Sequence, residues 1–170
     1  MSKEVRNLFQ EIIRNYVQMV EKELSQRWEN WALDFSEQEK YEVIGGLLAR
    51  QVSLATELAM SPSIWNENIA PLILRSMVDN FINIAWIFGD ALEKSRKYIL
   101  YGLGQEKLQL EHLKVQIKNA GQNPDEVEEV KVREKWINSQ RYTFLTEVTI
   151  GSWSGIDTRK MAEEANCLDV

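Results

Sequence analysis

The sequence is poor in the residues on which disulfides, metal sites and turn-rich folds depend. Its 170 residues include one cysteine, one histidine, three prolines and eight glycines. The single cysteine, Cys167, cannot form an intrachain disulfide, and this favours a reducing compartment such as the cytoplasm. So few prolines and glycines leave little room for an all-β chain with many turns.

An uninterrupted apolar run and an excess of positive charge are also missing. The N-terminus, Met1-Ser-Lys-Glu-Val-Arg6, lacks the apolar stretch of a signal peptide. The most apolar segment, residues 71–88, is interrupted by charged and amide side chains, which makes it a poor membrane span and a good buried helix. The net charge of −6 argues against a whole-surface attraction to nucleic acid, although a local basic patch stays open. We predict a cytoplasmic protein with no membrane partner.

Patterns for metal binding and catalysis are sparse. His112 shares a polar helix face with glutamines, so we expect it to be exposed. A carboxylate-bridged metal site would need Glu-x-x-His, but the residue three before His112 is Gln109. The sequence contains neither a Cys and His cluster for zinc nor a Gly-rich phosphate loop. We therefore predict no metal, no cofactor and no catalytic residue within this chain.

Apolar residues recur every three or four positions over most of the chain, which predicts amphipathic helices. Helix signals divide the pattern: Ser36 with Glu39 forms a capping box, Pro71 suits a first helical turn, and Asn123 can cap the helix that follows it. Gly45 and Gly46 indicate a close helix crossing. The fold class is all-α, a mostly antiparallel bundle of five long helices and a short last one. The expected helices cover residues 3–33, 36–60, 71–88, 90–121, 123–148 and 159–166.

The length suits one domain with a substantial core. No repeat, low-complexity tract or linker divides the chain, so we predict a single helical domain over residues 1–170. The sequence stops a few residues after its last expected helix. We expect this domain to be the N-terminal part of a longer protein.

A polar ladder of Arg75, Asp79 and Asn83 runs along the most apolar helix. Their spacing of four residues stacks them on one side. At about 100° per residue, the polar side chains fill an arc of roughly 140°, and the rest of the helix is apolar. The wide apolar arc predicts a central helix or one at an oligomer interface. Short amides beside Trp86, where a solvated face would carry Lys and Glu, favour a partly buried network.

The second helix offers partners for the ladder. Gln51 lies near the middle of its apolar arc, and Arg50 and Glu57 flank that arc. We predict a polar network between the two helices. Whether it fixes helix register or binds a ligand is left open by the pattern. The predicted network consists of Arg50, Gln51, Glu57, Arg75, Asp79 and Asn83, with Trp86 beside it.

Three segments carry a resemblance to a known family. They are Leu47-Leu-Ala-Arg-Gln51, Ala70-Pro-Leu-Ile-Leu-Arg-Ser-Met-Val-Asp79, and Trp153 with Asp157-Thr-Arg-Lys-Met-Ala162. Together they resemble a family of bacterial all-helical proteins of unknown function. The resemblance implies that an Arg and an acidic residue four positions later, here Arg75 and Asp79, lie on a central helix. It also implies a further C-terminal helix with Tyr, Ser and His residues, which this chain lacks.

The first function hypothesis is a helical interaction or scaffolding module of a bacterial stress or antiphage defence system. We expect it to self-associate or to bind a partner protein. One alternative is a ribonuclease similar to HEPN domains, whose motif places Arg a few residues before His. No Arg stands at that spacing before His112, since the nearest is Arg96, so its histidine would lie beyond residue 170. Another alternative is a small-ligand pocket between the second and third helices, lined by Arg50, Arg75, Asp79 and Trp86.

Overall fold

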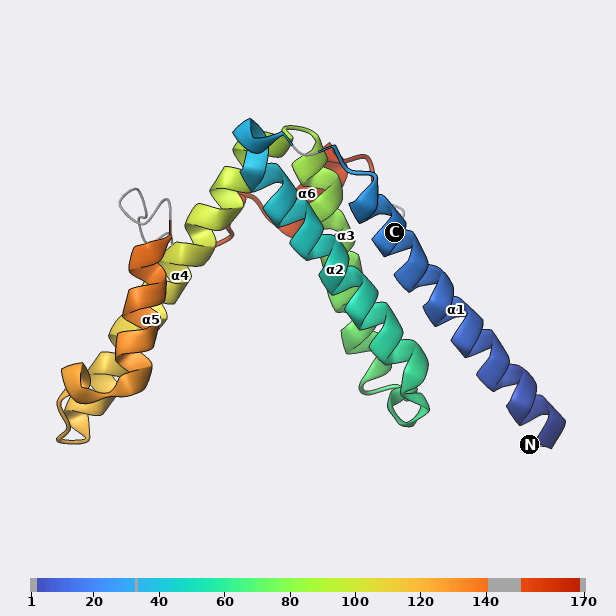
Figure 1. Cartoon of the computed structure of the whole chain (residues 1–170), viewed down its shortest axis with the longest axis horizontal. Helices are drawn as coiled ribbons and strands as arrows, with labels where there is room; N and C mark the ends of the chain where they lie inside the picture. Colours follow the sequence, from blue (N-terminus) through green and yellow to red (C-terminus); the bar gives the residue numbers. More distant parts are fainter. Residues whose placement is uncertain (1–2, 33, 141–150, 169–170) are drawn as a thin grey trace. The chain divides into compact units, whose positions relative to one another are not determined.

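The computed structural model describes residues 3–32, 34–140 and 151–168, and these residues form an all-α fold, as predicted (Figure 1). The structure is 81% helical, and no strand occurs in the described ranges. Short 3-10 turns precede or follow several helices: η1 (Phe35–Glu37), η2 (Pro62–Ile64) and η3 (Pro124–Glu126). The helices are α1 (Lys3–Glu29), α2 (Gln38–Met60), α3 (Ala70–Phe88), α4 (Ala91–Asn119), α5 (Glu128–Ser139) and α6 (Thr158–Glu164).

The capping box predicted from Ser36 is replaced by a cap on the turn η1 that leads into α2. The side chain of Asp34, not that of Ser36, accepts the capping hydrogen bond of η1, from the Ser36 backbone N–H at 2.9 Å, and the N-cap of α2 itself, Glu37, makes no side-chain capping bond. The hydroxyl of Ser36 donates to the same carboxylate oxygen at 2.7 Å. A charged carboxylate is a stronger acceptor than a hydroxyl, which explains why Asp34 takes this role. The turn therefore begins two residues earlier than the capping box indicated.

Most other helix boundaries follow the sequence signals, but α5 begins at Glu128 rather than at residue 123, and two helices end earlier than expected. Pro71 lies in the first turn of α3, and Asn123 caps η3 by accepting from the Asp125 N–H at 3.2 Å. However, α1 ends at Glu29 rather than at residue 33. Similarly, α5 ends at Ser139 because the next residue, Gln140, has an extended backbone. The expected continuation to residue 148 falls in residues 141–150, outside the described part of the chain.

The chain divides into two compact units, and the first holds residues 1–91 and 158–170. Within this unit α2 packs against both α1 and α3, and α6 packs against α3. The three long helices run antiparallel to their neighbours along the chain (Figure 1). Ile44 and Leu47 of α2, together with Ile84 and Ile87 of α3, are buried. The core of this unit therefore lies along the α2–α3 contact.

One segment that includes α2, Phe35–Met60, is long and apolar enough to cross a bilayer by length and composition. About a quarter of the apolar window, 28%, is buried in the protein. Its position between α1 and α3 is that of a core helix, and core helices pass the same test.

The second unit, residues 92–157, is built on α4 and α5. Its core contains Leu110, Val130 and Ile137, with Leu113 and Ile117 packed against them. The prediction of a single domain stays a prediction, because a division into compact units does not show whether they fold independently.

Candidate interaction surface

The predicted ladder lies at the surface of α3. Arg75 Nε is 3.6 Å from Asp79 Oδ2, and the two side chains are 78% and 41% exposed. Asn83 Nδ2 donates to the backbone oxygen of Asp79 at 2.8 Å. These contacts all join residues four apart on one helix. An exposed ion pair of this kind contributes only about 0.3–0.5 kcal/mol.

Three of the six residues predicted to form a network between α2 and α3 have exposed side chains. Arg50 and Glu57 are exposed on α2, and Arg75 is exposed on α3. The physical reason is their place at the edge of the helix contact, where long charged side chains extend into water instead of losing hydration. Gln51 is the member that does reach across to α3.

Asn80 is the polar side chain that joins the two helices. It is 4% exposed, and its Nδ2 donates to the Leu47 carbonyl at 2.8 Å and to Gln51 Oε1 at 2.9 Å. Asn80 lies outside the predicted network because the spacing of four residues runs through Arg75, Asp79 and Asn83 instead. The available signal was the placement of Gln51 in an apolar arc, since a buried amide requires a partner on the facing helix.

Trp86 lies on the side of α3 that packs against α6. Its side chain is buried, and Nε1 donates to Glu164 Oε2 at 2.7 Å. Arg75 is eleven residues from Trp86, which is about 16 Å along a helix. The small-ligand pocket lined by these two residues and by Arg50 stays a prediction. Two grooves in the described part of the chain lie between α1 and α2.

A row of exposed apolar side chains lies on α1 in the first unit. None of the 27 residues of this helix is buried. We define the outer stripe of α1 as five side chains that are 39–58% exposed: Val5, Leu8, Ile12, Tyr16 and Met19. At about 100° per residue they fall within an arc of roughly 80°. They form one continuous row rather than scattered apolar residues.

A different side of α1 contacts α2. Ile13, Val17, Val20 and Leu24 are half-buried there. The two apolar sides together cover about 180° of the helix, at about 100° per residue. The sequence placed them on one amphipathic face, and the unusual width of that face was the signal that it serves two surfaces.

The contact between α1 and α2 is loose. Two grooves follow it, with volumes of about 450 Å³ and 480 Å³. The first runs past Ile13 and Val17 to Met60, and the second lies between Leu24 and Ala49. At the far end of the helix, the Phe9 ring meets the Trp65 ring edge to face, with centroids 5.6 Å apart.

The C-terminal end of α1 is held firmly by aromatic packing. A Cβ atom added at Gly45 would lie 2.8 Å from Trp28 Cη2 and closer still to Cζ3. The close crossing predicted from the glycine pair thus occurs at Gly45, whereas Gly46 has open space. Trp31 packs edge to face on both Trp28 and Tyr41, at 5.7 and 5.0 Å.

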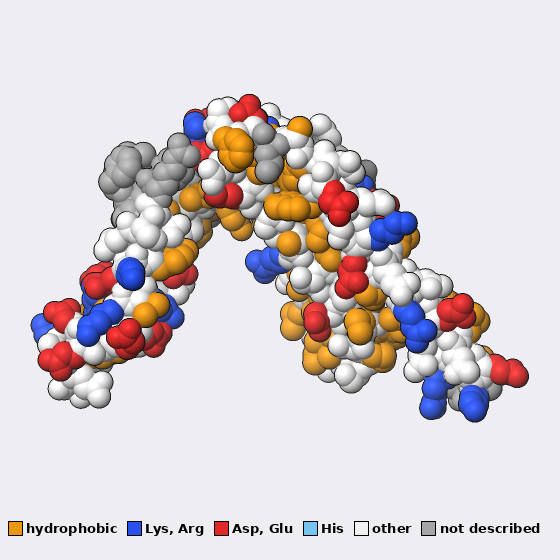
Figure 2. Space-filling model, viewed as in Figure 1, with side chains coloured by type: hydrophobic (Ala, Val, Ile, Leu, Met, Phe, Trp, Pro, Cys, Tyr) orange, Lys and Arg blue, Asp and Glu red, His pale blue; other side chains and the backbone are white. Residues whose placement is uncertain are grey.

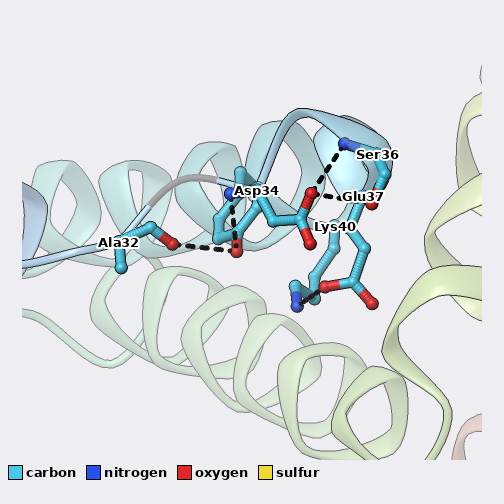
Figure 3. A network of polar contacts seen from close by, with 6 residues as sticks. Ala32, Asp34, Ser36, Glu37 and Lys40 are labelled. Atoms are coloured by element: carbon cyan, nitrogen blue, oxygen red, sulfur yellow. Dashed lines mark hydrogen bonds and ion pairs between the residues drawn. The ribbon is translucent and has the colours of Figure 1, made fainter.

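Hydrogen bonds fix the corner between α1 and α2 (Figure 3). The Tyr41 hydroxyl donates to the Ala32 carbonyl at 3.0 Å and accepts from the Asp34 N–H at 3.2 Å. The Ser36 hydroxyl and backbone N–H hold the pKa of Asp34 below its ordinary value. The carboxylate of Glu37 raises the pKa of Lys40, with which it forms an ion pair. The corner therefore positions α1, and nothing in this arrangement resembles a catalytic group.

A second exposed apolar row lies on α3. Leu74, Phe81 and Phe88 are 49%, 42% and 61% exposed, and they are spaced seven residues apart. This spacing keeps them on one side of the helix, away from the buried Asn80. Figure 2 shows one face of the molecule, on which hydrophobic side chains gather over the helices of the first unit. The wide apolar arc of this helix led to the prediction that it is central or lies at an interface. These exposed residues are consistent with that prediction.

Groups suited to chemistry are not brought together in the described residues. His112 is exposed on α4, as expected. The described ranges contain no group of three His, Cys, Asp or Glu side chains arranged to hold a metal ion. Cys167 is half-buried after α6. What the geometry offers is contact surface, chiefly the outer stripe of α1.

Residues 41–170 match a family of unknown function, DUF5677. The match includes the helices from α2 onward and leaves α1 outside it. Neither the curated proteins nor the solved structures contain a match.

Proposed function

The chain belongs to DUF5677, a family of unknown function, and on that premise we propose that it is a helical interaction module that self-associates. The observation that carries this proposal is the outer stripe of α1. It places five large apolar side chains in one row, each at least 39% exposed. Removing such apolar area from water stabilises a complex by about 25 cal/mol per Å² buried.

Isolated exposed apolar residues are normal on protein surfaces and need no explanation. The outer stripe differs because its members are neighbours on one helix. At roughly 180 Å² for a large side chain, their exposed fractions sum to about 450 Å². A patch of about this size is within the range of the largest apolar patch on a typical monomer, and such patches are often functional.

The finer part of the proposal is a scaffolding or regulatory role in a bacterial stress or antiphage defence system in the cytoplasm. It is supported by the resemblance of the segments around Gln51, Asp79 and Ala162 to bacterial helical proteins. The ribonuclease alternative has less support, because His112 has no Arg at the required spacing. A cell carrying the intact gene and one lacking it, compared for survival of phage infection, would test this role.

Self-association is tested by sedimentation equilibrium across a wide range of protein concentrations. We expect the wild-type chain to form a dimer that dissociates on dilution. The variant Leu8→Glu places a charge in the outer stripe and should shift the chain to monomer. Its matched control is Asn7→Glu, at the neighbouring exposed position on the opposite side of α1. A wild type that stays monomeric throughout contradicts the proposal.

A further inference from the structure

Because α1 presents its outer stripe away from α2, we propose that the helix pairs with the α1 helix of a second copy, parallel and in register, as a short two-stranded coiled coil. This inference rests on the proposed self-association and names its geometry. It also goes beyond the family match, since α1 precedes the matched residues 41–170.

The spacing of the outer stripe carries the proposal. Val5, Leu8, Ile12 and Met19 follow the alternation of three and four residues of a coiled-coil seam, and Asn15 occupies the one position between them. In heptad terms Val5, Ile12 and Met19 are at a, and Leu8 and Asn15 are at d. Tyr16 flanks the seam. β-branched residues at a with Leu at d favour two parallel strands over higher oligomers.

Asn15 gives the direction and the register. It is exposed on α1, between apolar residues one turn before and one turn after it. In a parallel, in-register pair it would face the Asn15 of the partner copy, and the two amides can hydrogen-bond to each other. In an antiparallel pair Asn15 would face Ile12 instead. Its amide would then be buried in an apolar layer without a hydrogen-bond partner from the second copy, which is unfavourable. A second copy of this chain therefore fits the stripe better in the parallel arrangement.

The seam also has a clear end. The next two positions in the pattern are Lys22 and Gln26, so the apolar row stops at Met19. It covers about 21 Å of helix, at 1.5 Å per residue. Beyond it, α1 is held on its own α2 by Trp28 over Gly45. The N-terminal half of the helix is thus available to a partner while the C-terminal half stays attached.

The area of the stripe sets the strength of the pair. Two copies of about 450 Å² bury about 900 Å² in total, which is below the roughly 1,200 Å² at which stable interfaces begin. We therefore expect a weak dimer that forms and dissociates with concentration. If the Leu74–Phe81–Phe88 row of α3 took part as well, the dimer would be tighter.

Disulfide trapping tests the register. In a Cys167→Ser background, Val5→Cys and Met19→Cys are made one at a time and oxidised at a concentration where the parent chain is dimeric. Parallel, in-register pairing brings each cysteine to its own counterpart, so both variants should give covalent dimers. The control Asn7→Cys, on the opposite side of α1, should give far less.

A second variant tests the role of Asn15. Asn15→Ile replaces the polar layer and should lower the dimer Kd by about tenfold or raise the oligomer order, whereas Asn7→Ile should leave the Kd unchanged.

A parent chain that dimerises while neither Val5→Cys nor Met19→Cys is trapped overturns the α1 pairing and leaves self-association standing. A mixture of Val5→Cys and Lys22→Cys chains that is trapped instead would show an antiparallel pair, which also overturns it. A parent chain that is monomeric at every concentration refutes both proposals.

Discussion

Replacing Asn80 by Ala is the sharpest test of what holds α2 and α3 together. The substitution removes two hydrogen bonds, to the Leu47 carbonyl at 2.8 Å and to Gln51 Oε1 at 2.9 Å, at a site that is 4% exposed. Each bond contributes about 0.5–1.5 kcal/mol, and leaving the Gln51 oxygen without this donor costs about 1 kcal/mol more. The higher helix propensity of Ala returns about 0.5 kcal/mol.

The expected loss of unfolding free energy is therefore about 2 kcal/mol. For a chain of this size it corresponds to a fall in Tm of roughly 4–8 °C. Urea unfolding followed by far-ultraviolet circular dichroism measures it directly. The matched comparison is Arg75→Ala, which removes only an exposed ion pair and should cost about 0.5 kcal/mol or less.

A double-mutant cycle makes the test specific. Asn80→Ala and Gln51→Ala should couple by about 1 kcal/mol, because the two side chains are hydrogen-bonded to each other. Arg75→Ala and Gln51→Ala should be additive. If Arg75→Ala proved as destabilising as Asn80→Ala, the assignment of the polar contact between these helices to Asn80 would be refuted.

Three further outcomes follow from the same structure. Gly45→Ala should destabilise the chain by about 1–3 kcal/mol, because its Cβ would overlap the Trp28 ring. Gly46→Ala has open space around it and should stabilise the chain by up to about 1 kcal/mol. Thermal unfolding should therefore show a lower Tm for the first variant and a higher Tm for the second. Asp34 has a lowered pKa, so its contribution to stability is present above its unfolded-state pKa and disappears as pH falls through the folded-state pKa. Asp34→Ala should therefore be less stable than wild type near neutral pH and differ little from it in strong acid. Unfolding curves recorded at both pH values measure this difference. Val130→Ala opens a cavity at a fully buried site in the second unit and should cost about 2 kcal/mol in urea unfolding, whereas an effect within error would contradict the packing described there.

The candidate site was only partly predictable from the sequence. A spacing of four residues correctly put Arg75, Asp79 and Asn83 on one side of α3, because helix periodicity is local. Whether that side faces water or another helix depends on where α2 and α6 pack, and no local pattern encodes this. The ladder was therefore predicted at the contact with α2, whereas Asn80 occupies it.

The same limit applies to α1. Its apolar residues predict a helix, but the sequence does not separate those that contact α2 from those that stay exposed. Only the packing of Ile13 and Leu24 against α2 leaves Ile12 on a different, exposed side. The heptad spacing of the outer stripe becomes visible once that division is made.

The sequence by itself determined the all-α class and most helix boundaries, because periodicity, capping residues, prolines and glycines act within a turn or two of the chain. Gly45–Gly46 also correctly indicated a close crossing, since few other arrangements compensate for two glycines in a helix. The tertiary structure alone decided which helix crosses there, which amide is buried between α2 and α3, and which side of α1 remains exposed. Those outcomes depend on pairs of surfaces that lie far apart in the sequence, and burial, not local preference, selects among them.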